Sequence, residues 1–295
     1  MLFVAFRKLI STAVAVLIPG RAMRHKVRYA LHPLNDRRCT AYFRHKYVRR
    51  TILQPQPTAE LPKEGTEHIW QCWLQGRDAA PPLVDFCLRS VEQHRRPNQQ
   101  IALITEENYA QYVHLPPFIV EKRRNGQIVD AQFSDLLRIY LLATYGGYWI
   151  DATCLLTAPI PDWIDKAPFF MFRSHGEFAY TQIQSCFIRA KANTYLVQRW
   201  RQLMEELWRN EPHMLHYFQF HLMFKAMITA DERAASEYQQ MPQASETATQ
   251  TLFFQMRARH LLSQQMIEDA ARHSFIHKLT YKIAVRSECF EIPTS

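Results

Sequence analysis

Residues 133–159 read FSDLLRIYLLATYGGYWIDATCLLTAP, and this stretch decides the fold class. Leucine and aromatic residues fill its first half, which predicts a helix that Ser134 or Asp130 could cap. The double glycine that follows predicts the end of that helix in a left-handed turn. Residues 148–150 are then a short apolar run, typical of a strand that is buried on both faces. A helix, a glycine stop and a buried strand together indicate an α/β protein.

Asp151 stands directly after this predicted strand. In open α/β sheets the ligand crevice lies outside the carboxyl ends of the strands, so a carboxylate at this position is a candidate site residue. Asp135 and Arg138 are three residues apart and therefore share one face of the helix. A capping acid with a paired arginine is the alternative reading of these two charges. Their combination with the double glycine and the strand-end carboxylate favours a ligand site.

The order SDxxR, GG and an aromatic strand ending in Asp resembles the bacterial capsular polysaccharide synthesis family. This family lies within the DxD-containing sugar-binding glycosyltransferase group. The resemblance covers roughly residues 67–225, with a further patch near the C-terminus. It implies that Asp135 and Arg138 grip the donor sugar and its ribose, that Gly147 belongs to the donor site, and that both charges act in catalysis with Asp151.

In that group the DxD motif holds a divalent metal on the donor diphosphate. This chain has Asp151-Ala152-Thr153, so a neutral hydroxyl replaces the second acid. Magnesium is often bound by one or two carboxylates together with substrate phosphates, which can complete such a shell. The resemblance therefore implies a manganese or magnesium site formed by Asp151 and Thr153, with His277 as a third protein ligand, that fills only together with the nucleotide.

Two further donor-site candidates lie far apart in the chain. Residues 68–74 alternate like a strand, and the resemblance places Trp70 near the nucleotide base and leaves Trp73 for the core. Burial of Trp70 is the alternative, because most strand tryptophans are core residues. The pair His277-Lys278 resembles a late His-Lys pair that approaches the donor diphosphate, and a plain surface charge is the alternative for Lys278.

The acceptor side is less defined. The stretch 215–224, LHYFQFHLMF, resembles a YFxxH segment in which His221 is the matching residue, with a role beside the acceptor or in support of the site. A satisfied core histidine is the alternative. The loop that begins at Ser174 is expected near the acceptor, with His175 at the surface. Residues 230–248 are polar and predict a mobile loop over the cleft.

Composition removes several other classes of protein. A hydrophobic fraction of 47% in 295 residues is enough for a sizeable core. Six cysteines are scattered without a CxxC or a His/Cys cluster, which argues against a zinc site and a disulfide framework. No P-loop, GxGxxG or GxSxG occurs, so the kinase, Rossmann dehydrogenase and α/β-hydrolase classes lack their usual signals.

The formal net charge of +9 belongs to the N-terminal end of the chain. Residues 21–50 hold ten Lys or Arg and one acid, whereas residues 51–295 hold 24 basic and 26 acidic residues. An apolar stretch over residues 1–18 beside these cations, and hence residues 1–50 as a whole, predicts an arm that lies on an anionic membrane surface. A signal peptide, a helix packed on the body and RNA binding are the alternatives, and no nucleic-acid partner is expected.

These patterns predict one GT-A-like (Rossmann-like) α/β domain over residues 59–295, with a mixed sheet flanked by helices and a helical C-terminal part. A helical arm and a linker over residues 1–58 precede it. The resemblance implies transfer of a sugar from a nucleotide-sugar donor to a surface polysaccharide or lipid-linked glycan, with retention of configuration. Such an enzyme of capsule or lipopolysaccharide biosynthesis would be peripheral on the inner, cytoplasmic face of the membrane. A non-catalytic carbohydrate-binding or scaffold protein and a nucleic-acid-binding protein are the alternatives.

Overall fold

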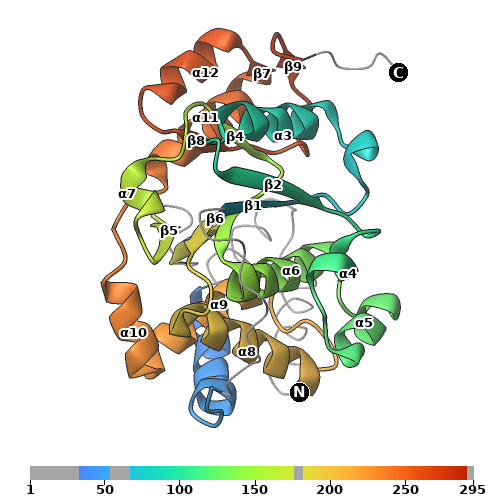
Figure 1. Ribbon diagram of the computed structural model, residues 1–295, viewed down its shortest axis with the longest axis vertical. Coiled ribbons are helices and arrows are strands. Elements are labelled where there is room, and N and C mark those ends of the chain that lie inside the picture. The colour runs from blue at the N-terminus through green and yellow to red at the C-terminus, as the bar shows by residue number, and fades with distance from the viewer. Residues whose placement is uncertain (1–32, 54–66, 176–181, 291–295) are drawn as a thin grey trace, which may run out of the picture.

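The computed structural model describes residues 33–53, 67–175 and 182–290 of the chain (Figure 1). Its main sheet contains five strands, in the order β2 (Gln99–Ile104), β1 (Glu67–Cys72), β3 (Gly147–Ile150), β6 (Ile183–Ala190) and β5 (Phe169–Arg173). Strand β1 is parallel to β2 and β3, whereas β6 is antiparallel to β3 and β5. The expected mixed α/β sheet flanked by helices is confirmed.

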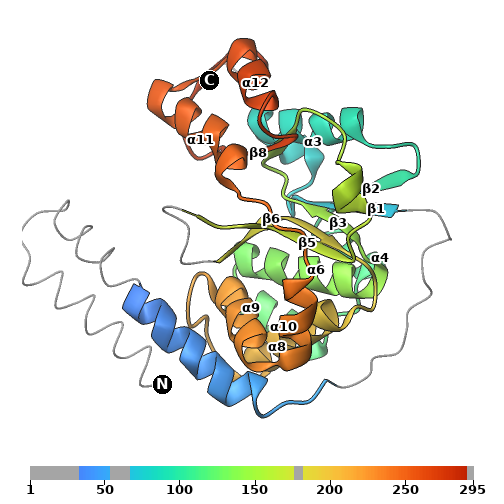
Figure 2. The same cartoon turned by 90° about the vertical axis from the view of Figure 1, so that its left-hand side faces the viewer.

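Helices cover both faces of the sheet (Figure 2). One side carries α3 (Pro82–His94), α11 (Thr247–Arg259) and α12 (Gln264–Ala271), and the other carries α6 (Asp130–Tyr145), α8 (Tyr195–Asn210), α9 (Gln219–Ala230) and α10 (Glu232–Gln239). Short elements fill the connections: η2 (Arg77–Ala79), α4 (Tyr109–Tyr112), α5 (Pro117–Arg124) and α7 (Asp162–Asp165). In the part of the chain that the structure describes, no helix has the length and apolarity to cross a membrane.

The predicted helix, glycine stop and buried strand are all present as α6, Gly146-Gly147 and β3. Both glycines have positive φ, 69° and 91°. A Cβ atom on Gly147 would lie 2.2 Å from the carbonyl oxygen of His68, and one on Gly146 would lie 2.5 Å from the backbone nitrogen of Ala192. Only glycine therefore allows β3 to lie this close to β1.

The start of α6 differs from the expectation. No side chain caps this helix, so the capping role predicted for Ser134 or Asp130 is wrong. Asp130 is already within the first turn, where its carboxylate pairs with Arg123 at 2.6 Å. An acid in the first turn still favours the helix electrostatically, because it lies at the positive end of the helix dipole.

The later part of the chain adds two small sheets, and one of its segments differs from the expectation. Strand β4 (Cys154–Leu156) does not extend the main sheet but pairs antiparallel with β8 (Ile276–Lys278), which brings the C-terminal region to the end of β3. The polar residues 230–248 contain α10, capped by the Asp231 side chain, and do not form one long loop. A second small sheet pairs β7 (Leu261–Leu262) in parallel with β9 (Arg286–Ser287).

Residues 33–53 belong to the folded body. They continue a helix through residue 43 into η1 (Arg44–Val48), which packs beside α8 and α9 (Figure 2). Phe43 and Tyr47 are buried in the main core, and Glu211 accepts hydrogen bonds from Lys46 at 2.6 Å and from Tyr47 at 2.5 Å. The expected boundary after residue 58 is therefore wrong for residues 33–53, while the predictions for residues 1–32 fall outside the described residues.

Candidate functional site

A cavity of about 540 Å³ opens where β1 and β3 end. Its walls come from one side of α6, the residues after β3, the first residues of β6, the start of α9, one side of α11 and the segment after β8. Because the carboxyl ends of parallel strands are the usual ligand position in α/β sheets, this is the location that the sequence predicts for Asp151.

Asp151 is bound by two cationic side chains. The Lys278 ammonium donates to Asp151 Oδ2 at 2.7 Å and to the hydroxyl of Thr153 at 2.6 Å. On the other oxygen, Arg138 Nη2 lies 3.2 Å from Asp151 Oδ1, which also accepts from Trp149 Nε1 at 2.7 Å. Each oxygen of this carboxylate is thus already partnered by a cation.

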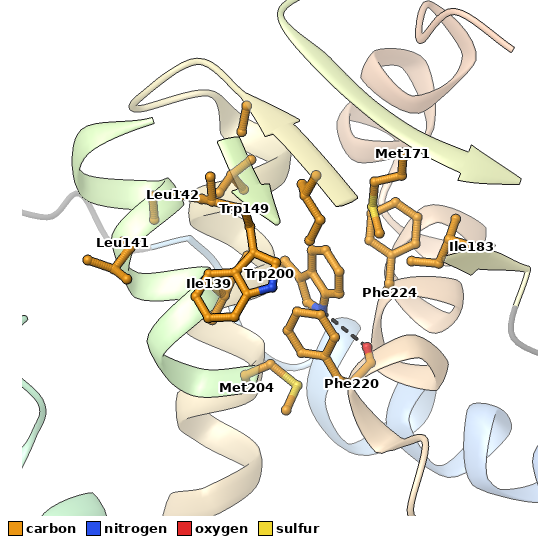
Figure 3. Close-up of a cluster of buried hydrophobic side chains, with 14 of the residues drawn as sticks. Ile139, Leu141, Leu142, Trp149, Met171, Ile183, Trp200, Met204, Phe220 and Phe224 are labelled. Carbon is orange, nitrogen blue, oxygen red and sulfur yellow. Dashed lines mark hydrogen bonds between the residues drawn. The ribbon is translucent and has the colours of Figure 1, made fainter. Parts of the chain in front are cut away.

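Arg138 is held in place by its own surroundings. Its Nη1 donates to the carbonyl of Ser185 at 2.6 Å, and its guanidinium lies 4.8 Å from the ring of Trp149. Figure 3 shows Trp149 beside Trp200 and Phe220, and the Trp200 indole donates to the Phe220 carbonyl at 3.2 Å. Arg138 packs on this aromatic cluster, which also holds the first turn of α9 in place.

Asp135 lies beside the same guanidinium, 3.5 Å from Arg138 Nη2. Burial raises the pKa of Asp135 to about 7, although Arg138 acts in the opposite direction. Burial would also raise the pKa of Asp151, but Lys278 and Arg138 outweigh it and lower that pKa to about 2. The two carboxylates therefore differ: Asp151 is a fixed anion, whereas Asp135 gains and loses a proton near neutral pH.

The two tryptophans exchange the roles expected of them. Trp70 is 1% exposed and donates to the Gly146 carbonyl at 2.8 Å, so it belongs to the core. Trp73 lies just beyond the end of β1, lines the cavity and meets Tyr281 edge-on at 5.3 Å. The prediction of a nucleobase beside Trp70 is wrong, because this side chain packs on a covered face of the sheet, whereas Trp73, past the end of the strand, reaches the opening.

Gly147 is not part of the cavity wall either. It begins β3, at the opposite end from Asp151, and its role is the close approach to β1 described above. His221 does line the cavity, and no described residue bonds its Nδ1. Burial, together with Arg138, lowers the pKa of His221 to about 3, so this ring is neutral.

The expected metal ligands do not come together. Neighbouring residues of a strand point to opposite faces, so Lys278 faces the cavity while His277 is 0% exposed and lies 3.2 Å from the hydroxyl of Thr157. Asp151 and Thr153 are both bonded to the Lys278 ammonium. No cluster of three or more His, Cys, Asp or Glu side chains suited to a metal occurs among the described residues. The residues present therefore do not fit a divalent metal.

The prediction missed one wall of the cavity. Glu246, Gln250 and Phe253 lie on one side of α11 and its N-cap and line the cavity. Their spacing of four and three places them on one helix face. The sequence shows this face, but it does not show which other elements the face packs against. Only the fold brings this face to the start of β6.

The structure is thus an α/β protein whose mixed sheet brings Arg138 and Lys278 together at the end of β3. Residues 25–290 match the family model described as "Capsular polysaccharide synthesis protein". The chain belongs to this family, which confirms the resemblance drawn from the motif order.

Two fungal proteins show more distant similarity. O-glycosyltransferase braB of Annulohypoxylon truncatum is 25% identical over 163 residues, or 50% of this chain and 39% of that protein. O-glycosyltransferase PaGT of Phomopsis amygdali is 24% identical over 165 residues, or 50% of this chain and 40% of that protein. The chain therefore spans about two fifths of the length of these relatives. Among solved structures, PaToxG Glycosyltransferase aligns with a TM-score of 0.39 and 12% identity, over 72% of this chain and 86% of that one.

Proposed function

We propose that the protein is a glycosyltransferase that takes its sugar from a nucleotide-sugar donor. The observation that carries this proposal is the convergence of Arg138 and Lys278 at the end of β3. A buried arginine and a half-buried lysine in one cavity suit a diphosphate leaving group, whose charge must be stabilised as its bond to the sugar breaks. Membership of the family and the names of the two fungal relatives support the same class of reaction.

In the proposed reaction, an acceptor hydroxyl oxygen bonds to C1 of the donor sugar while the bond from C1 to the β-phosphate oxygen breaks. The electron pair of that bond stays on the nucleoside diphosphate, where Arg138 and Lys278 balance its charge. The hydroxyl proton passes to the leaving phosphate oxygen on the same side of the sugar, so the anomeric configuration is retained and no protein base is required. Asp135 holds donor hydroxyls and thereby orients C1.

The base of the nucleotide would lie against Trp73 and Tyr281, the aromatic pair that lines the cavity. Aromatic faces stabilise a planar base by stacking, and this pair takes the place that the sequence predicted for Trp70. No step of the proposed mechanism passes through a metal, since Lys278 occupies the carboxylate and hydroxyl that a metal would need.

We further propose a surface polysaccharide or lipid-linked glycan of capsule or lipopolysaccharide biosynthesis as the acceptor. The enzyme would act at the inner face of the cytoplasmic membrane. Support for this location comes from Arg37, Arg49 and Arg50, which are exposed on residues 33–53, while the opposite side of that segment packs in the core. Near-surface cations of this kind contribute about 1 kcal/mol each on anionic lipid.

Calorimetry on the full chain with UDP, GDP, CDP and dTDP tests the proposal, followed by mass spectrometry of sugar release from the matching donors. One nucleoside diphosphate should bind, and Arg138→Ala should weaken it by about ten- to a hundredfold, as expected for a lost charge-assisted hydrogen bond. The exposed Arg37→Ala serves as the control. Failure of the folded chain to bind any of the four would refute the proposal.

A further inference from the structure

The cavity has two halves of different chemistry. The cationic side chains that line it are Arg138, Lys278 and Lys282, and all three come from α6 or from the segment at the end of β8. Among the described cavity residues, those from β6 and α11 include no lysine or arginine. The half formed by β6 and α11 is therefore unsuited to a second phosphate, and its ligand must be recognised by other groups.

Glu246 supplies the carboxylate of this half. It is 3% exposed, and no lysine or arginine pairs with it in the described part of the chain. Its oxygens accept the backbone N–H of His175 at 3.0 Å and the Ser174 hydroxyl at 3.4 Å. Burial raises the pKa of Glu246. A carboxylate has about four acceptor positions, so a buried one with two neutral donors keeps acceptor capacity for a ligand.

Two carboxamides lie beside this carboxylate. Gln250 is 8% exposed, lines the cavity and makes no side-chain hydrogen bond to another described residue. Gln184, on β6, accepts the Thr249 hydroxyl at 3.3 Å, but its Nε2 is buried without a described partner. A buried side-chain polar atom normally has at least one hydrogen-bond partner. The unpaired Gln184 Nε2, with the Gln250 carboxamide beside it on the cavity wall, therefore points to a ligand that both donates and accepts.

Strand β6 connects this half to the cationic half. The Asp151 N–H donates to the Cys186 carbonyl at 2.8 Å, and Gln184 lies two residues earlier on the same strand. At about 3.3 Å per residue, the two positions are roughly 7 Å apart along β6. A group bound between Gln184 and α11 is thus next to anything held at Asp151.

We infer that Glu246, Gln250, Gln184 and Phe253 form an acceptor subsite for a hydroxyl-rich carbohydrate, an assignment that rests on the proposed glycosyltransferase function. Glu246 accepts hydrogen bonds from sugar hydroxyls, and the carboxamides donate and accept others. Phe253, half-buried on the cavity wall, packs against the apolar face of a sugar ring. A lipid tail would leave the Gln250 carboxamide and Gln184 Nε2 without partners, and an anionic acceptor would be repelled by Glu246.

The experiment measures transfer with p-nitrophenyl glucoside, galactoside and mannoside as acceptors, and with benzyl alcohol and a tyrosyl peptide as non-sugar acceptors. Glu246→Gln and Gln250→Ala should raise the acceptor KM by about tenfold or more, the effect of losing one or two hydrogen bonds to a buried group. The affinity for the nucleoside diphosphate and the slow hydrolysis of donor without acceptor should not change. Glu268→Gln, exposed on α12, and Gln255→Ala, on α11 but outside the cavity wall, are the matched controls.

Glu246 could instead serve only to hold the turn at Ser174. In that case Glu246→Gln would lower the melting temperature and donor binding together, and Gln250→Ala would leave the acceptor KM unchanged, which would overturn the subsite. Preferred transfer to benzyl alcohol or the peptide would overturn the carbohydrate class. A folded chain that binds no nucleoside diphosphate would instead refute the proposed function itself, so the two failures are distinguishable.

Discussion

At the scale of single residues, the position of the Lys278 ammonium is the feature with the largest chemical consequence. It lies where the sequence predicts a metal, bonded to both Asp151 and Thr153. An ammonium supplies a fixed positive charge without coordination geometry. Burial alone would lower the pKa of Lys278, but Asp151 outweighs it and raises that pKa above the ordinary value, so the side chain stays charged.

Excess chelator is therefore expected to leave sugar transfer by the wild-type chain unchanged. Lys278→Met should weaken binding of the nucleoside diphosphate by about tenfold or more, because a charge-assisted contact in the cavity is lost. In this variant the freed Asp151 and Thr153 should bind Mn²⁺ together with the nucleotide, which paramagnetic resonance can detect. The exposed Lys191→Met is the control, and loss of wild-type activity in chelator would contradict the prediction.

Replacement of Asp135 is expected to affect turnover and thermal stability in different ways. Its pKa of about 7 is above the ordinary value, so the ionised carboxylate destabilises the folded state above pH 7, and this penalty disappears as the pH falls towards 4. Asp135→Asn should therefore melt at or above the wild-type temperature at pH 8 and like the wild type near pH 4, while turnover falls by orders of magnitude. Thermal melts at both pH values, with the exposed Asp78→Asn as control, check this. A lower melting temperature at pH 8 would show that the ion pair with Arg138 dominates.

At the scale of elements, the junction between α6 and β3 was predictable because its signals are local. Apolar periodicity, a double glycine and an apolar run all lie within one stretch. The partner of β4 was not predictable, since β8 follows it by more than a hundred residues and only the pairing register decides that Lys278, and not His277, faces the cavity. The assignment of Trp70 and Trp73 failed for a related reason: strand periodicity is visible in sequence, but the point where a strand leaves the sheet is not.

The same junction gives a direct test of backbone packing. Gly147→Ala places a Cβ atom 2.2 Å from the His68 carbonyl oxygen at a φ of 91°, so backbone must move. We expect a loss of more than about 3 kcal/mol, the range of severe single substitutions. Gly126→Ala is the matched control, because it has a φ of 71° with no atom within 4 Å and should cost only about 1 kcal/mol of strain. Urea titration of both variants measures the difference, and equal losses would contradict the packing argument.

At the scale of the whole molecule, the basic N-terminal stretch combines exposed cations with side chains that belong to the core. The charge count correctly locates the cations of this stretch. The sequence could not show that Phe43 and Tyr47, which lie among these cations, are core residues. Arg199, buried on α8, donates to the carbonyls of Val48 at 2.8 Å and Thr51 at 2.7 Å. Contacts between residues this far apart in the chain cannot be read from composition. Composition alone therefore suggested an arm that is independent of the body.

A chain that starts at residue 59 is accordingly expected to lose its cooperative thermal transition. Arg199 would lose its bonds to Val48 and Thr51, and the Glu211 carboxylate would lose Lys46 and Tyr47. Near-UV circular dichroism and thermal melts of the truncated and full chains test this. Arg37→Glu is the control for charge, since Arg37 is exposed and its replacement should leave the melt unchanged. A truncated chain with native stability would restore the picture of a detachable arm.

The distance along the chain between Asp151 and Lys278, 127 residues, also sets the order in which the protein can mature. All five strands of the main sheet have been synthesised by Ala190, whereas β8 follows only at Ile276. Pairings this distant form late, since the closure of a long loop must come before the contact that stabilises it. During translation the sheet can therefore assemble while Asp151 still lacks its lysine, and a chain interrupted before β8 would have the architecture without the charge balance on which the chemistry depends.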